Sequence, residues 1–252
     1  MNNKTINKYI RLLIIITLFL AGSLCNDLIL RDNNIVYADT EYKTYVDGNI
    51  EYRYAEEKDG TITLYAFNMQ EEQDSLVIPD YINGKKVTGI GYDTDIFYTF
   101  NYGFPVKNLE LPDTITSIAT YGLAGLRIES IKLPSSLSKI SDGCLSCCSN
   151  LKTIEIPENV TSIGDDAFEN CDSLENITIP EKVIDIGEGA FHYCDKLKEV
   201  NIEGKVNIGK NCFQSCEALE QIIANNGIKS IGDFAFEDCK SLKKFMVLFR
   251  QK

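Results

Sequence analysis

The side chains best suited to chemistry in this 252-residue sequence are nine cysteines and one histidine. Cys144 and Cys147 have the Cys-x-x-Cys spacing that can hold zinc or exchange disulfides. His192 could serve as a general acid or base, and the acidic pair Asp165 and Asp166 could contribute oxygen ligands to calcium. Whether these side chains can perform any of these roles depends on the secondary-structure elements that position them.

The cysteines recur with a fixed period, together with three other residue types. The leucine that opens each unit returns after steps of 23, 23, 22 and 23 residues. Four columns stay in phase: Leu151, Leu174, Leu197, Leu219 and Leu242; Cys148, Cys171, Cys194, Cys216 and Cys239; Ile163, Ile186, Ile208 and Ile231, each followed by Gly; and Phe168, Phe191, Phe213 and Phe236. Such a period indicates a stack of repeats.

The same pattern extends upstream in weaker form. Leu76–Gly91 is the first candidate unit, Leu109–Leu123 the second and Ile128–Asn150 the third. The sequence therefore predicts a solenoid over 76–252, degenerate to about residue 127 and regular over 128–247.

The sequence pattern within one unit predicts the local secondary structure of that unit. In "LKTIEIP", Ile154 and Ile156 point to one face and Thr153 and Glu155 to the other, as in a half-buried strand. Pro157 ends that strand. "VTSIG" is typical of a second short extended piece, and "DDAFENC" has the length of a helical or 3₁₀ turn. Because one unit cannot bury its apolar face alone, successive units must stack, with their strands in a parallel sheet.

This stacking explains most of the cysteines as core residues. Five occupy the cysteine column, and Cys144 and Cys212 fall where Ala167 and Ala190 stand, which leaves Cys25 and Cys147 outside the columns. Strands about 4.8 Å apart hold equivalent Cβ atoms farther apart than the ~3.5–4.5 Å of a disulfide. We expect free ladder thiols and no metal or other cofactor.

The remaining reactive types also have structural explanations. His192 shares a column with Glu169, which we expect to be an exposed surface position. Asp165 and Asp166 begin a turn, where acids are favoured, and no loop collects oxygen ligands at calcium spacing. Since no serine or cysteine lies in a nucleophile-elbow setting, we predict that the protein is not an enzyme.

The N-terminus has the features of a signal peptide. Lys4, Lys8 and Arg11 precede an uncharged, mostly apolar run, Leu12–Cys25, which is shorter than the ~20 residues of a spanning helix. We expect residues 1–38 to be the signal, with cleavage after Ala38 and no membrane insertion afterwards. The alternative is an uncleaved membrane anchor.

Residues 39–75 do not repeat and are expected to form an N-terminal β cap. Two alternating segments surround Asp59 and Gly60, which predicts a β-hairpin that covers the first coil. A small independent binding module is the alternative. The aromatic insert Gly91–Pro105 either fills the wide end of the stack or anchors a sugar or protein.

At the other end, "LKKFMVLFRQK" supplies one more strand. Either this strand is an economical cap, or the chain is a truncated fragment of a larger adhesin, which is the interpretation we favour. Otherwise Phe245, Val247 and Phe249 would expose apolar surface there, which invites self-association through the C-terminal rung.

The consensus "LxxIxIPxxVxxIGxxAFxxC" resembles the BspA-type leucine-rich repeat family of bacterial surface proteins, over roughly Leu76–Val247. The resemblance implies an α/β solenoid: a right-handed, curved stack with a parallel sheet on one face and short helical turns on the other. It also implies a secreted or cell-surface location and a role in adhesion.

These observations favour a module that binds an extracellular protein or glycan through its strand face. The net charge of −12, without clustered Lys and Arg, argues against nucleic acid as a partner. The alternative function is a structural or self-associating surface component. The candidate ligand-binding residues are the outward strand positions Ser130, Lys132, Thr153, Glu155, Asn176, Thr178, Glu199, Asn201, Gln221 and Ile223.

Overall fold

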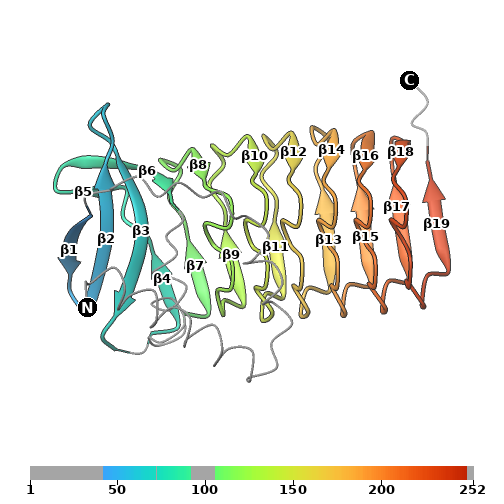
Figure 1. Cartoon of the computed structure of the whole chain (residues 1–252), viewed down its shortest axis with the longest axis horizontal. Coiled ribbons are helices and arrows are strands. Elements are labelled where there is room, and N and C mark those ends of the chain that lie inside the picture. The colour runs from blue at the N-terminus through green and yellow to red at the C-terminus, as the bar shows by residue number, and fades with distance from the viewer. Residues whose placement is uncertain (1–41, 72, 92–105, 249–252) are drawn as a thin grey trace, which may run out of the picture. The chain divides into compact units, whose positions relative to one another are not determined.

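The computed structural model describes residues 42–71, 73–91 and 106–248, which belong to one compact unit, Glu41–Lys252 (Figure 1). These residues form nineteen β-strands and contain no helix, so none of them forms a helix that could span a membrane. The predicted signal peptide with its cleavage site, Cys25, Phe249 and nearly all of the aromatic insert lie outside the described residues.

Each coil contributes one long strand, and these strands pair in parallel in two four-stranded sheets. The first sheet contains β4 (Ser75–Val77), β7 (Asn108–Glu110), β9 (Ser130–Lys132) and β11 (Thr153–Glu155). The second contains β13 (Asn176–Ile179), β15 (Glu199–Ile202), β17 (Gln221–Ala224) and β19 (Lys244–Val247). Figure 1 shows the eight strands side by side in sequence order. The predicted parallel stacking of the repeats is therefore confirmed.

A further parallel sheet runs along the coils, built from the short extended pieces. Its five strands are β10 (Lys139–Ile140), β12 (Ser162–Ile163), β14 (Asp185–Ile186), β16 (Val206–Ile208) and β18 (Ile228–Ile231). The preceding coil contributes β8 (Ser117–Ile118), which pairs with β6 (Lys85–Ile90). Each coil thus places two strands in two separate ladders.

The prediction of short helical turns is wrong for the described residues. The segment after each Ile-Gly pair is a run of tight turns, with left-handed φ angles of 52° at Asp166 and 55° at Asn170. The amides of Asp166, Phe168 and Asn170 donate to carbonyls of the next coil at 2.8–2.9 Å. A helix would use the same amides internally, four residues back, so bonding between coils replaces helix formation.

The glycine column is required by the close approach of neighbouring coils. At Gly187 a Cβ would lie 2.5 Å from the amide nitrogen of Asp165, and at Gly209 it would lie 2.4 Å from the carbonyl oxygen of Gly187. Backbone atoms cannot yield as a flexible side chain can. The glycines are therefore needed for space, and no left-handed φ is involved at these two positions.

The core consists of the predicted columns. The rings of Phe168, Phe191, Phe213 and Phe236 stack in order, with centroids 5.0, 5.2 and 5.5 Å apart and planes within 6° of parallel. Leu151, Leu174, Leu197 and Leu219 are fully buried. Since equivalent side chains lie above one another, each coil covers the apolar face of the next.

The hairpin predicted from Asp59 and Gly60 is formed by β2 (Ile50–Glu56) and β3 (Ile62–Met69), with β1 (Lys43–Asp47) on the outside of β2. β3 pairs in parallel with β6, and β5 (Tyr81–Ile82) turns back onto β6. The hairpin thereby continues a ladder of the coils. Its role as a protective cap stays a prediction.

Candidate binding surface

The outward positions of the long strands form two rows that cross the coils. Pairing places Ser130 beside Thr153 and Lys132 beside Glu155, and the same register continues between the other neighbours within each sheet. The residues between them, such as Ile131 and Ile177, point inward and are buried. A partner that lies across the coils would therefore meet one or two side chains from each coil.

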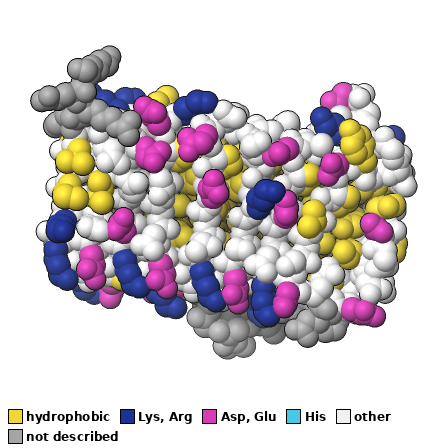
Figure 2. Space-filling view, turned by 180° about the vertical axis from the view of Figure 1, so that it is seen from behind, with side chains coloured by type: hydrophobic (Ala, Val, Ile, Leu, Met, Phe, Trp, Pro, Cys, Tyr) yellow, Lys and Arg dark blue, Asp and Glu magenta, His cyan; other side chains and the backbone are white. Residues whose placement is uncertain are grey.

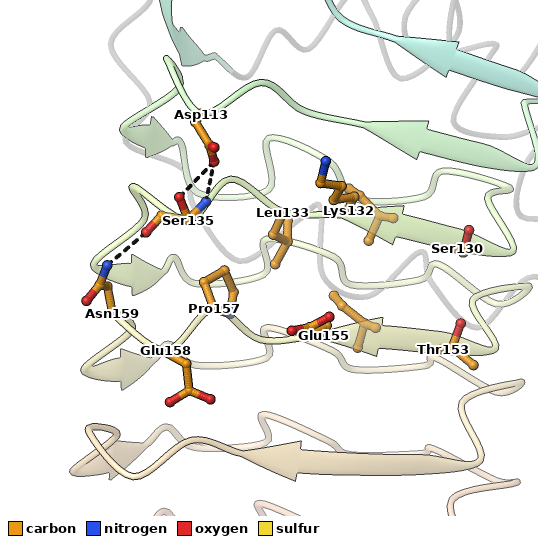
Figure 3. A pocket seen from close by; sticks show the side chains of 12 residues that line it. Asp113, Ser130, Lys132, Leu133, Ser135, Thr153, Glu155, Pro157, Glu158 and Asn159 are labelled. Atoms are coloured by element: carbon orange, nitrogen blue, oxygen red, sulfur yellow. Dashed lines mark hydrogen bonds between the residues drawn. The ribbon is translucent and has the colours of Figure 1, made fainter.

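A hollow of about 640 Å³ lies over β9 and β11 and the loops that follow them (Figure 3). Four predicted residues line it: Ser130, Lys132, Thr153 and Glu155. The other lining residues are Asp113, Ile131, Leu133, Ser135, Ile154, Pro157, Glu158 and Asn159. Its volume is in the range of small-molecule and side-chain pockets, and its lining mixes apolar carbon with hydrogen-bonding groups of both kinds.

The N-terminal side of the hollow is held by a polar network across the coils. The Ser130 hydroxyl donates to Asn108 Oδ1 at 2.7 Å. Lys132 forms an ion pair with Glu110 on β7, and this bond raises the pKa of the lysine. The side chain of Lys132 remains 71% exposed, so its ammonium is fixed in position and still open to solvent.

The loops on the same side are joined in a similar way. Asp113 accepts hydrogen bonds from the amide and the hydroxyl of Ser135, at 2.7 and 2.9 Å, which hold the pKa of its carboxyl below the usual value. Asn159 donates to the carbonyl oxygen of Ser135 at 3.1 Å and accepts from Lys182 at 2.8 Å. These bonds fix the rim of the hollow from coil to coil.

The other six predicted residues lie on the second long-strand sheet, outside the hollow. They are Asn176, Thr178, Glu199, Asn201, Gln221 and Ile223. Gln221 donates to Glu199, and Asn225 donates to Asn201 at 2.7 Å. The structure thus brings four of the ten together in one concavity and leaves six on an amide-rich continuation of the face.

Sequence reasoning missed the lining contributed by the loops, and it missed the residues of β7 that bind Ser130 and Lys132. Asn108 and Glu110 flank the inward Leu109, so the alternation of that strand could have identified them. Asp113, Ser135 and Asn159 follow the strands by several residues. Only the stacking of coils brings these three together, and no pattern within one unit signals it.

The thiols behave as the column argument predicts. Cys144, Cys148, Cys171, Cys194, Cys212, Cys216 and Cys239 are free, and all but Cys239 are buried. In the cysteine column each thiol donates to a backbone carbonyl of the preceding coil, for example Cys194 to Phe168 at 3.2 Å and Cys216 to Phe191 at 3.1 Å. Burial raises the pKa of these thiols, which removes nucleophilic thiolate. Cys147 is in a disulfide.

The prediction that His192 is exposed is wrong. Its side chain is only 19% exposed, because its ring stacks on Tyr193 with centroids 3.8 Å apart. Its Nδ1 lies 3.9 Å from a carboxylate oxygen of the buried Glu169. Burial lowers the pKa of the imidazole. Within the described ranges, no group of three or more His, Cys, Asp or Glu side chains is arranged to hold a metal.

Comparison with known proteins agrees with this architecture. The family model described as the BspA-type leucine-rich repeat region, in six copies, matches residues 96–216 and 206–248. The chain belongs to this family of leucine-rich repeat proteins. No match was found among curated proteins.

Two solved structures are similar to the chain. A leucine-rich repeat protein of T. pallidum is 25% identical over 80% of this chain and 91% of its own, with a TM-score of 0.63. The pneumococcal vaccine antigen PcpA is 19% identical over 81% of this chain and 70% of its own, with a TM-score of 0.51. The second similarity concerns the fold alone.

Proposed function

We propose that the chain is a secreted or cell-surface binding module that recognises an extracellular protein or glycan through the long-strand face. The hollow over β9 and β11 carries this proposal, because it is a concave site on the face where side chains vary from coil to coil. Lys132, Glu155 and Thr153 supply a cation, an anion and a hydroxyl around Leu133 and Pro157. Such a lining suits hydroxyl-rich sugars and polar peptide segments. Membership of a bacterial leucine-rich repeat family supports the surface location.

The test is a pair of charge reversals, Glu155→Lys with Glu199→Lys. Binding would be measured on an immobilised glycan panel and on solubilised extracellular-matrix and bacterial cell-wall proteins. We expect at least a tenfold loss of affinity for any ligand bound by the parent, with a melting temperature within about 2 °C, because Glu155 is exposed and Glu199 is only partly buried.

The matched control is Glu188→Lys with Glu237→Lys, which makes the same charge change away from the strand face. Glu188 and Glu237 are exposed and lie in the turns that follow the short strands β14 and β18. Equal losses in both variants would show that net charge controls binding. Unchanged binding in the strand-face variant would remove this face from consideration.

A second candidate function is supported by apolar surface at the last coil. Ile231, Phe234 and Leu248 are 49%, 60% and 49% exposed, and Phe245 and Val247 are also exposed. Such a patch favours a structural component that associates through the C-terminal rung. Light scattering of the parent protein over a concentration range, at high salt, tests this second function. Association that strengthens at high salt is expected for the parent, and Phe234→Ser should abolish it. A parent protein that stays monomeric at high salt contradicts this function.

A further inference from the structure

The residue immediately before each of the eight long strands is charged, and its sign alternates without exception. We call this row the charge ladder: Asp74, Lys107, Glu129, Lys152, Glu175, Lys198, Glu220 and Lys243. Figure 2 shows acidic and basic side chains alternating along the lower edge of the molecule. The eight side chains are between 40% and 72% exposed, so the ladder lies on the surface.

Within the ladder each base pairs with the acid of the preceding coil. The N–O distances are 2.6 Å for Lys107–Asp74, 2.7 Å for Lys152–Glu129, 2.9 Å for Lys198–Glu175 and 3.8 Å for Lys243–Glu220. All four pairs have the same direction, with the acid on the N-terminal side and the base on the C-terminal side. The ladder is therefore a row of four parallel dipoles along the stack.

Strict alternation is not a general property of the surface columns. The column after the Ile-Gly glycines contains Asp142, Asp165, Glu188, Lys210 and Asp233, which is four acids and one base. Exposed ion pairs contribute little to the stability of a fold. The fold therefore tolerates unbalanced columns, and the regularity of the charge ladder calls for another explanation.

The ladder is complementary to itself when reversed. An alternating row with an even number of charges that begins with an acid ends with a base, so an antiparallel copy places a base opposite every acid. Lys152 would face Glu175 of the second copy, and Glu129 would face its Lys198. The two-fold axis would pass between β11 and β13, where the long-strand sheet divides into its two halves.

We propose that this edge is an isologous interface with a second copy of the chain, closed by two-fold symmetry. Each dipole of one copy would lie antiparallel to a dipole of the other, so that two ion pairs become a ring of four alternating charges. That arrangement is attractive at every position and cancels the aligned dipoles of both copies. Since all members are solvated, the association is weak and depends on ionic strength.

A parallel copy shifted by one coil would also match charges, but it leaves one charge unmatched at each end and repeats without closing. The even count and the central sheet division both favour the closed, antiparallel arrangement. The strand face and its hollow are not part of the interface, so this inference is independent of the proposed function.

Sedimentation velocity of the purified protein tests the parent first. At about 20 mM salt the protein should approach a dimer mass with rising concentration, and at about 1 M salt it should be a monomer, because the Debye length shrinks to a few ångströms. A monomer at all concentrations in low salt overturns the proposal. Assemblies that keep growing beyond a dimer overturn the two-fold geometry, and association that persists at high salt points to the apolar C-terminal rung.

Complementary reversals then test the register. In a dimer of the Lys152→Glu variant, the new glutamate of each copy would face Glu175 of the other copy, which gives two acid–acid contacts. In a dimer of the Glu175→Lys variant, the new lysine of each copy would face Lys152 of the other copy, which gives two base–base contacts. Each variant should self-associate about tenfold more weakly than the parent. An equimolar mixture restores opposite charges at both positions, so it should form a heterodimer of nearly parental affinity. A mixture that fails to recover while both variants keep a cooperative melting transition overturns the register.

The control pair reverses an ion pair on another column. Lys210 and Glu188 are 3.0 Å apart and half exposed, like the members of the ladder. Lys210→Glu and Glu188→Lys should leave the dimer unchanged, alone or mixed. If these variants weaken association as much as the ladder variants do, the effect comes from net charge and the proposed edge is wrong. If a ladder variant does not fold, the salt response of the parent still decides the proposal.

Discussion

At the scale of single residues, the Ile-Gly column shows how close packing between coils restricts side-chain choice. Gly164, Gly187, Gly209 and Gly232 each have backbone atoms of the preceding coil within 2.8 Å of where a Cβ would stand. Further upstream, Ser141 occupies the same column and donates to the carbonyl oxygen of Ile118. The column is therefore glycine from Gly164 onward, and the coil before it accommodates a serine.

Gly187→Ala should destabilise the protein by about 1–3 kcal/mol, because the added methyl group forces neighbouring backbones apart. Thermal and urea unfolding would measure this loss. Thr178→Ala, on an exposed strand position of the same coil, should change stability by less than about 0.5 kcal/mol. Equal stabilities of the alanine variant and the parent would mean that the coils are spaced more widely than described.

The inward-facing residues could be predicted from the sequence. The prediction failed for local structure that depends on hydrogen bonds between coils. Leu174 and Phe191 could be assigned to the core because their period matched that of four independent columns. The turn "DDAFENC" could not be distinguished from a helical turn, because its composition suits both. Hydrogen bonds from the backbone amides to carbonyls of the next coil select the run of tight turns over a helical turn. The sequence of a single unit does not contain that information.

At the scale of elements, the cysteine column is a row of buried hydrogen-bond donors. The thiols of Cys171, Cys194, Cys216 and Cys239 each donate to a backbone carbonyl of the phenylalanine column, in which Leu145 takes the place of phenylalanine one coil before Phe168. Each of these carbonyls also accepts a hydrogen bond from a backbone amide, so the thiol supplies a second donor and leaves no buried polar hydrogen without a partner. This explains why cysteine recurs in a chain where it forms no ladder disulfide.

We expect the six fully buried thiols to be unreactive in the native protein. Burial raises the pKa of Cys144 and Cys148 to about 12, and it keeps reagents away from Cys171, Cys194, Cys212 and Cys216. A thiol-specific chromogenic reagent at about pH 8 should label them only as the protein unfolds. Rapid native labelling of several thiols would contradict the stacked core.

The hollow is also an element-scale feature, and it gathers four of the ten residues that were predicted from the sequence. Ser130, Lys132, Thr153 and Glu155 were predicted from strand alternation and do line it. Its rim at Ser135 and Asn159 comes from loops whose position depends on bonds between coils. Whether any of the ten strand residues binds a ligand stays a prediction that the charge-reversal variants test.

At the scale of the whole molecule, stability is a sum of interfaces between neighbouring coils, so the ends matter more than in a globular core. The hairpin of β2 and β3 joins the first coils through β6, with Ile62 and Leu64 buried there. Its removal would uncover the edge of β6, which could then pair with another chain.

Deleting residues 42–69 should therefore lower the melting temperature by at least about 5 °C and cause aggregation during heating, since several buried side chains lose their cover. Calorimetry with turbidity would follow both effects. Asp59→Ala, in the hairpin turn, keeps the strands and should have a small effect. A deletion variant as stable and soluble as the parent would favour an independent module over a cap.

The alternation of the charge ladder restricts how such an array can grow by gene duplication. Copying a single coil would set two like charges next to each other at the point of insertion and would leave the row with an odd number of members. Copying two adjacent coils keeps every neighbour opposite in sign and the total even. Longer descendants of this array, and engineered extensions of it, should therefore be built in steps of two coils.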